Sequence, residues 1–222
     1  MRPTNVLARA AVDVWKATLA PQRVAAWQAH DASLHRFLRA SIPEALEHTG
    51  EAAFDEHLVG VQTVLRVFGA DDDVCDAGLF HSIYGTEGFQ GYKLPMAKRP
   101  EIRRLLGPRA ERLVWMFCVL DRAAFDKTLF ASSTPTALVA RPELGRFDIP
   151  LASTAEYHDL MELVLADWMD QVEGAAARAN PLFERWESTS RLCAGPGARR
   201  SKTLCAAFTS ESRRRRATWC KP

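Results

Sequence analysis

Apolar residues recur every three or four positions through most of residues 1–175, the period of an amphipathic helix. No alternating apolar and polar run is long enough to predict a strand. The pattern predicts helices over residues 5–19, 21–40, 53–68, 71–83, 109–124 and 154–171. Segments 84–100 and 126–153 contain Gly and Pro residues that interrupt regular structure, so we expect them to be irregular. The sequence therefore predicts an all-α protein.

The predicted helix 109–124 contains a segment, Leu113–Leu120, that is apolar on all sides. This pattern is typical of a central helix that is buried all round. Upstream, Gly69 is placed to end the helix 53–68, and Asp71 is placed to cap the next one. The two helices are therefore expected to form a tight corner.

The net charge of +2 is distributed unevenly along the chain. Residues 188–222 hold nine basic residues and one acid, net +8, which leaves −6 for the rest. We expect N-terminal helices over 1–50 that pack on a helical domain at 51–187, followed by a disordered basic tail at 188–222. A basic run can bind nucleic acid or an anionic membrane, or act as a nuclear address. We favour a solvated appendage without function. Nucleic acid would be bound only through this tail.

Other features indicate a cytoplasmic protein. No run approaches 18 consecutive apolar residues, so no membrane span is expected. An odd count of five cysteines without a CxxC pair indicates a reducing compartment and no structural zinc module. Cys75 and Cys118 are predicted to be small core residues. Residues 1–20 are basic enough for a mitochondrial transit peptide, but their apolar spacing favours an ordinary first helix.

Two histidines, 24 residues apart, stand out as candidate ligands. His57 flanks the apolar stripe of the helix 53–68, and His81 continues the stripe of the helix 71–83. Both rings should point toward the bundle interior. Neutral imidazole is a common ligand of zinc, iron and manganese. The residues alone predict either a metal site or a hydrogen-bonded pair of core histidines.

A metal site also needs an anionic ligand, and two carboxylates are candidates. Asp167 borders the apolar stripe of the helix 154–171, while Asp121 closes the buried run. Burying an unpaired carboxylate is expensive, so either one should be paired or coordinated. The alternative for Asp121 is a salt bridge to Arg122, Arg112 or Lys127. The alternative for Asp167 is a solvent-facing position shared with Glu156, Asp159 and Asp170.

His57, the segment Leu79-Phe80-His81 and Ala166-Asp167 together resemble the HD superfamily of metal-dependent phosphohydrolases. The resemblance is closest to the hydrolase domain of the alarmone (guanosine polyphosphate) enzymes, and it covers about residues 50–172. The segment FHSIYGTEGF is also similar to a little-characterised group of small HD-like proteins from microbes and algae. The resemblance implies an HD-like helical bundle in which His57, His81 and Asp167 bind a divalent metal (Mn, Zn or Fe).

The chain departs from the HD pattern at Ser82 and again at the two positions Gly85 and Thr86. Ser82 stands where the family has the Asp of its His-Asp pair, and serine is a neutral, weak ligand. Gly85 and Thr86 replace the acidic pair that follows in the alarmone hydrolases, although Glu87 lies nearby. The resemblance then implies either a reduced ligand set or a domain that has lost hydrolysis. A literal His158-Asp159 pair lies on another helix and is interpreted as surface.

For an active site, the resemblance implies hydrolysis of a small phosphoester or nucleotide, with bound water of pKa about 7. The candidate catalytic residues are Ser82, Glu87 and Lys93. Candidate substrate-binding residues are Tyr84, Tyr92 and Arg99, with Arg103 as a further partner for phosphate charge. The alternative for the segment 93–104 is a solvated basic surface.

Two other functions fit the same scaffold. Some HD-like proteins hold two irons and cleave small alcohols or phosphonates with oxygen. Such enzymes need more histidine and carboxylate ligands than this chain clearly offers. The histidines His30, His35 and His48 all lie N-terminal to the motif. The second alternative is a catalytically inactive binding module in which His57 and His81 share a hydrogen-bond network. Metal content distinguishes the module from either enzyme.

Overall fold

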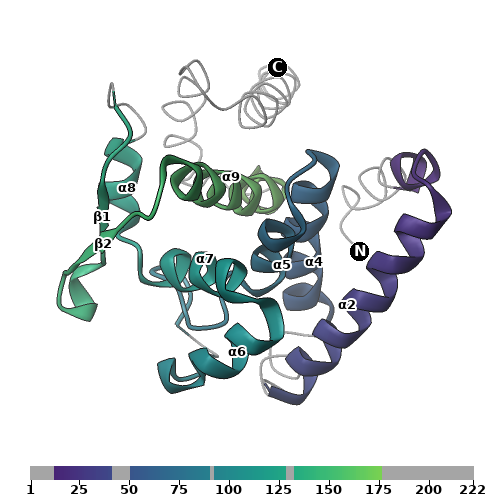
Figure 1. Cartoon of the computed structure of the whole chain (residues 1–222), viewed down its shortest axis with the longest axis horizontal. Helices are drawn as coiled ribbons and strands as arrows, with labels where there is room; N and C mark the ends of the chain where they lie inside the picture. Colours follow the sequence, from purple (N-terminus) through teal and green to yellow (C-terminus); the bar gives the residue numbers. More distant parts are fainter. Residues whose placement is uncertain (1–12, 42–50, 91–92, 129–132, 177–222) are drawn as a thin grey trace.

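The structure is a computed structural model that describes residues 13–41, 51–90, 93–128 and 133–176. Its α-helices are α2 (Pro21–Ser41), α4 (Glu51–Val67), α5 (Asp72–Phe80), α6 (Arg99–Leu106), α7 (Pro108–Val119), α8 (Arg122–Thr128) and α9 (Thr154–Ala176). Short 3-10 turns lie at Met96–Lys98 and Pro142–Leu144, and β1 (Ala137–Val139) pairs antiparallel with β2 (Asp148–Pro150). The prediction of an essentially all-α fold is confirmed (Figure 1).

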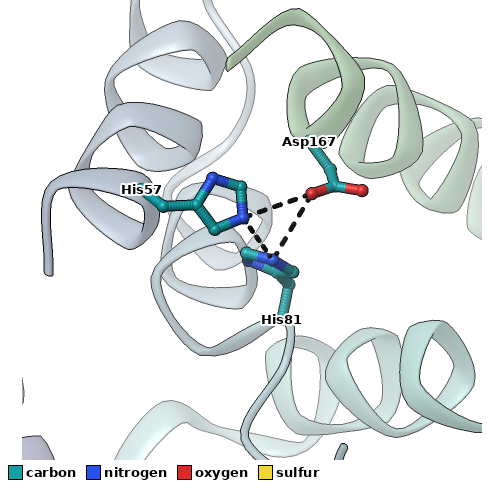
Figure 2. Close-up of side chains that lie close together, drawn as sticks. All are labelled: His57, His81 and Asp167. Atoms are coloured by element: carbon teal, nitrogen blue, oxygen red, sulfur yellow. Dashed lines mark hydrogen bonds and ion pairs between the residues drawn. The ribbon is translucent and has the colours of Figure 1, made fainter. Parts of the chain in front are cut away.

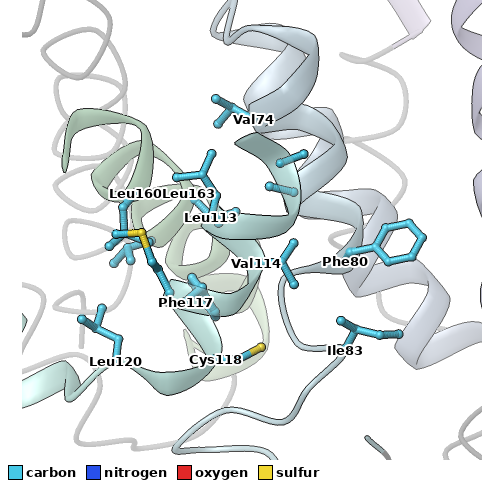
Figure 3. Close-up of a cluster of buried hydrophobic side chains, with 14 of the residues drawn as sticks. Val74, Phe80, Ile83, Leu113, Val114, Phe117, Cys118, Leu120, Leu160 and Leu163 are labelled. Carbon is cyan, nitrogen blue, oxygen red and sulfur yellow. The ribbon is translucent and has the colours of Figure 1, made fainter. Parts of the chain in front are cut away.

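Helix α7 lies at the centre of the bundle. It packs against α5, α6 and α9, while α4 covers α5 and α9 (Figure 1). Leu113, Val114 and Phe117 of α7 are buried; Leu113 lies on the side of Leu163 of α9, and Val114 on the side of Phe80 of α5 (Figure 3). The prediction of a buried central helix is thus confirmed, although Trp115 is only partly buried.

The helix predicted over 109–124 is two helices, which corrects the sequence interpretation. Leu120 is extended, with φ −62° and ψ 134°, and forms a β-bridge with Ala140. Asp121 then begins α8 as its cap, because its Oδ1 accepts a hydrogen bond from the Ala124 backbone N–H at 2.8 Å. Helical periodicity continues through the break, so the sequence pattern did not reveal it.

Two further elements were not predicted: the β1–β2 hairpin lies in the segment 126–153 that was expected to be irregular, and α6 begins at the end of the segment 84–100 and continues through residues that no predicted element covered. Helix α6 spans eight residues with Pro100 in its first turn, and the β1–β2 hairpin has strands of three residues each. Both elements are shorter than the windows in which a periodic pattern can be recognised.

The corner between α4 and α5 places the two histidines side by side. Gly69 has φ +75°, and the backbone N–H of Ala70 bonds to the Leu65 carbonyl, so α4 ends here as predicted. Asp71 is the cap residue of α5, but its carboxylate makes no cap hydrogen bond and pairs with Arg109 instead. A Cβ on Gly78 would lie 2.6 Å from Leu65 Cδ1, so this glycine allows α4 and α5 to pack closely.

The N-terminal region contributes α2, which runs along one side of the bundle (Figure 1). The helix buries Leu34 and Leu38, and the ring of Phe37 packs near that of Phe80. Of the predicted helix 5–19, residues 13–17 are helical and the first part lies outside the described residues, as does the predicted tail 188–222. Within the described ranges, no helix has the length and apolar character needed to cross a bilayer.

Candidate metal centre

Three side chains from three parts of the chain meet at one point (Figure 2). His57 lies on α4, His81 follows the last residue of α5, and Asp167 lies on α9. The distance from His57 Nε2 is 3.2 Å to His81 Nε2 and 3.4 Å to Asp167 Oδ1, and His81 Nε2 lies 3.6 Å from the same oxygen. Their ligand atoms all lie within 4.8 Å of one another, so in the described part of the chain these three side chains form a group that could hold a metal ion.

The spacing of the three donor atoms fits a divalent metal. A metal about 2.1 Å from each ligand of a tetrahedral site holds the ligand atoms about 3.4 Å apart. The three observed separations, 3.2, 3.4 and 3.6 Å, bracket that value. Two imidazoles and one carboxylate are also a donor set that zinc and other divalent metals use. The residues therefore fit the metal that the HD resemblance implies.

His81 is held as a neutral imidazole with one nitrogen directed at the site. Its Nδ1 lies 2.8 Å from the Gly78 carbonyl oxygen, which can only accept, so Nδ1 carries the proton and Nε2 keeps its lone pair. The ring is buried and lies edge-on to Phe117, with centroids 5.0 Å apart. Burial is the main cause that lowers the pKa of His81, to about 4. At neutral pH this ring can bind a metal without first losing a proton.

His57 lies in a more polar and more negative environment. Its Nδ1 lies 2.7 Å from Asp170 Oδ2, while its Nε2 faces Asp167 and His81. Burial by itself lowers the pKa of His57, but the hydrogen bonds and charges of Asp167 and Asp170 outweigh it and raise the pKa to about 9. The two carboxylates thus favour positive charge at this position, whether it comes from a proton or a metal.

Asp167 is an ionised, buried carboxylate. Burial by itself raises its pKa, but hydrogen bonding to His57 and the nearby charge of Arg122 help to lower it overall. Gln171 donates to its Oδ1 at 2.7 Å, and Arg122 Nη2 lies 3.7 Å from its Oδ2. Of the two candidate carboxylates, Asp167 is the one that lies beside both histidines.

A cavity of about 590 Å³ adjoins the three ligands. Ser82 reaches it with a hydroxyl that is buried and has no hydrogen-bond partner among the described residues. Arg122 extends across its wall, with the guanidinium 4.9 Å from the ring centroid of Phe117 and 5.5 Å from that of Trp168. The cavity is lined by His57, His81, Ser82, Thr86, Glu87, Gly88, Phe89, Phe117, Arg122, Asp167, Trp168 and Gln171.

The loop after α5 folds over this cavity. Thr86 and Phe89 exchange backbone hydrogen bonds, and Glu87 Oε2 accepts one from the backbone N–H of Arg122 at 3.2 Å. The loop therefore brings Glu87 to the cavity wall, close to Ser82 in sequence and to Arg122 in space.

Four of the predicted site residues lie away from the cavity. Asp121 caps α8, and the Lys93 ammonium donates to Gln90 at 2.7 Å. Tyr84 donates to the buried carboxylate of Glu111 at 3.2 Å, and Arg99 binds the same carboxylate at 2.6 Å while lying over Trp115. The structure thus places Tyr84 and Arg99 in a buried ion-pair network and does not bring them to the candidate ligands.

Neither Arg103 nor the His158-Asp159 pair belongs to the group of three ligands. Arg103 is exposed on α6, and Tyr92 lies outside the described residues. Asp159 of the literal His158-Asp159 pair accepts a hydrogen bond from Arg109 at 2.8 Å, as part of an ion-pair cluster with Asp71. Both residues of that pair are partly buried.

Sequence reasoning missed two residues of the site, Asp170 and Arg122. Asp170 was considered only as part of an exposed acidic face, and Arg122 only as a partner for Asp121. The signal for Asp170 was its position three residues after Asp167, which places both carboxylates on one face of a helix. No comparable signal marked Arg122, because its role depends on how α8 meets α9.

Comparison with known proteins gives one match. A family model described as a domain of unknown function, DUF6817, matches residues 37–122. The matched range contains His57, His81 and Ser82 but ends before Asp167 and Asp170, and it covers less than half of the chain. No curated protein and no solved structure matches the chain. The match assigns no chemistry to the two histidines.

Proposed function

We propose that this protein is a divalent-metal-dependent hydrolase of the HD superfamily type, with a His-Ser pair in place of His-Asp. Its substrate would be a small phosphoester or nucleotide. The observation that carries this proposal is the triangle of His57, His81 and Asp167 beside a cavity whose wall includes Arg122. A divalent metal bound there would supply a water of pKa near 7 and polarise a phosphoryl oxygen.

The three ligands support an open catalytic site better than a closed structural one. Catalytic zinc sites keep three protein ligands and leave a further position for water or substrate. Here all three ligands line the same cavity, so that position would face the space where a substrate can bind. About 590 Å³ also lies within the usual size range of small-molecule sites.

Arg122 would bind the negative charge of the substrate. Its side chain is 14% exposed and lies against Phe117 and Trp168, so the guanidinium is held in one orientation near Asp167. A guanidinium in a partly buried site forms strong, directional hydrogen bonds to phosphate oxygens. Arg122 thereby takes the role that the sequence had suggested for Arg99 and Arg103.

Ser82 would contribute a hydrogen bond to the substrate. An unsatisfied buried hydroxyl costs about 1–3 kcal/mol, so a ligand that supplies its partner gains that interaction. Replacing the family's Asp by Ser also removes one negative charge beside the metal. A divalent ion with Asp167 as its one anionic ligand leaves net positive charge, which favours an anionic substrate.

Glu87 would accept a proton at the cavity wall. It is the carboxylate that the loop after α5 brings to the cavity, and its Oε2 is held by the backbone N–H of Arg122. A carboxylate in such a position can act as a general base within hydrogen-bond reach of a substrate or water.

A second function is favoured by the ligand set itself. Two histidines and one carboxylate with open positions are also the ligands of mononuclear non-haem iron oxygenases. A mononuclear oxygenase needs one iron. The two-iron enzymes of HD type need ligands beyond the one group of possible metal ligands that the described residues provide. Iron without phosphoester hydrolysis would favour this alternative.

The test is phosphate release by the full-length chain after reconstitution with Mn²⁺, Zn²⁺ or Fe²⁺. A panel of phosphomonoesters and nucleotides is used, with His57→Ala as the inactive control. Release of phosphate or phosphorylated product that requires the metal and His57 supports the hydrolase. A folded, metal-loaded chain that hydrolyses none of the panel contradicts it.

A further inference from the structure

The ring of His57 is held by a carboxylate from a distant helix. Asp170 Oδ2 on α9 lies 2.7 Å from His57 Nδ1 on α4, across 113 residues of sequence. The side chains are 23% and 26% exposed respectively, so this contact is partly shielded from water. His57 Nε2, on the other side of the ring, faces His81 and Asp167 (Figure 2).

We infer that Asp170 is a positioning residue for the metal centre, and that Gly60 provides the space it needs. The inference rests on the proposed metal site. An ionised carboxylate can only accept, so its hydrogen bond keeps a proton on His57 Nδ1. The lone pair for the metal is then on Nε2, and the ring is aimed at the other two ligands. Partners of this kind fix the tautomer and orientation of metal-binding histidines.

Gly60 lies one helical turn after His57, directly beneath the Asp170 carboxylate. A Cβ at position 60 would lie 1.9 Å from Asp170 Oδ1 and 2.6 Å from its Cγ. Any other residue here would therefore displace the carboxylate. The obstructed atoms form the end of a rotatable side chain, so a methyl group would move Asp170 away from His57 without forcing α4 and α9 apart. The absence of a side chain at Gly60 thus serves the contact between His57 and Asp170.

The test is a double-mutant cycle on the full-length chain, with zinc affinity measured by competition with a chelator. Asp170→Ala should weaken zinc binding about 10–100-fold, the usual effect of losing such a partner. Gly60→Ala should weaken it to a similar extent, and the double variant no further than Asp170→Ala alone. Asp170→Asn keeps a neutral acceptor and should lose less. Val59→Ala, a neighbouring exposed position on α4, is the matched control and should bind as wild type does.

A second readout distinguishes positioning from general stability. In the proton NMR spectrum of the zinc-loaded chain, the Nδ1–H of His57 should exchange slowly with water. Both Asp170→Ala and Gly60→Ala should lose this signal, while the Nδ1–H of His81, bonded to the Gly78 carbonyl, persists. A role in folding alone would not affect one ring and spare the other.

The outcomes separate this inference from the proposed function. If the wild-type chain binds zinc and Asp170→Ala binds it equally well, the positioning role is overturned and the metal site stands. Additive losses from Gly60→Ala and Asp170→Ala overturn the role of Gly60. A folded wild-type chain that binds no zinc overturns both the site and the role.

Discussion

The two histidines of the candidate centre meet at one point but are held in different ways. His81 is fixed by its own helix, because its Nδ1–H donates a hydrogen bond to the Gly78 carbonyl one turn earlier, at 2.8 Å. His57 is fixed by Asp170, which belongs to a helix 113 residues away. Burial lowers the pKa of His81 to about 4, whereas two carboxylates raise that of His57 to about 9 against the effect of burial.

This difference separates a local contribution from a long-range one. The position of His81 follows from its own helix, α5, and from the buried ring of Phe117 beside it. The position of His57 depends on one contact between α4 and α9. Changes on α9 should therefore affect His57 selectively, while His81 should be disturbed only when the core is.

The largest expected effect is loss of metal on removing either ring. His57→Ala and His81→Ala should each weaken zinc binding more than about 100-fold, beyond the loss from an outer partner. Their effects on folding should differ. His81→Ala leaves a cavity beside Phe117 and should lower the free energy of unfolding of the metal-free chain by about 2–3 kcal/mol at neutral and alkaline pH alike. His57→Ala leaves the carboxylates of Asp167 and Asp170 without their partner, so its cost should be large below about pH 6.5 and should be lost as the pH rises through about 9. Chelator competition and urea denaturation measure the two effects, and an equal pH dependence of destabilisation in both variants would contradict the distinction.

The next effect concerns the carboxylate that completes the site. Asp167→Asn removes the one anionic ligand and should weaken zinc binding about 100-fold. Asp121→Asn is the matched control, because asparagine caps a helix about as well as aspartate and Asp121 lies at the start of α8. Zinc affinity measured side by side decides between them. Loss of metal in the Asp121 variant alone would show that α9 does not supply the ligand.

Arg122→Ala should affect turnover more than metal binding. Without the guanidinium, kcat/KM for a phosphoester should fall about 100-fold, the usual size of lost charge stabilisation at a reacting group. Zinc affinity should not fall, because Arg122 Nη2 lies 3.7 Å from Asp167 and is not a ligand, and loss of a nearby positive charge favours a bound cation. Arg103→Ala, an exposed arginine on α6, should leave both quantities unchanged. Steady-state kinetics with zinc- or manganese-loaded protein provides the comparison.

The smallest effect is expected from Ser82→Ala. Loss of one hydrogen bond to the substrate should lower kcat/KM about tenfold. The free energy of unfolding should rise slightly or stay within about 0.5 kcal/mol, because the hydroxyl that is removed has no partner in the described part of the chain. A clear loss of stability without loss of turnover would mean that Ser82 is structural.

The fold could be predicted from the sequence where the determinants are local. Helical periodicity identified α2, α4, α5, α7 and α9, and Gly69 marked the corner that joins α4 to α5. The break at Leu120 was missed because it depends on a bridge to Ala140, twenty residues later. Helix α6 was missed because eight residues that include a proline give too short a pattern.

The site follows the same division. His57, His81 and Asp167 could be proposed from helical facing together with the HD resemblance, and the structure brings all three together. Asp170 had only its place beside Asp167 on one helix face as a signal, and Arg122 had none, because each acts across an interface between elements far apart in sequence. Arg99 and Tyr84 were attractive as basic and aromatic residues near the motif. Their side chains meet the buried Glu111, a pairing that sequence position does not reveal.

The most direct test of the central claim is the metal content of the full-length chain, purified without metal-chelating resin and measured by elemental mass spectrometry. We predict about one equivalent of zinc, manganese or iron per chain in the wild type, with little or none in His57→Ala. Zinc or manganese would accord with the hydrolase, and iron with the oxygenase alternative. A stably folded wild-type chain that contains no metal and takes up none on addition would contradict the account. It would leave His57, His81 and Asp167 as a hydrogen-bond network in a binding module.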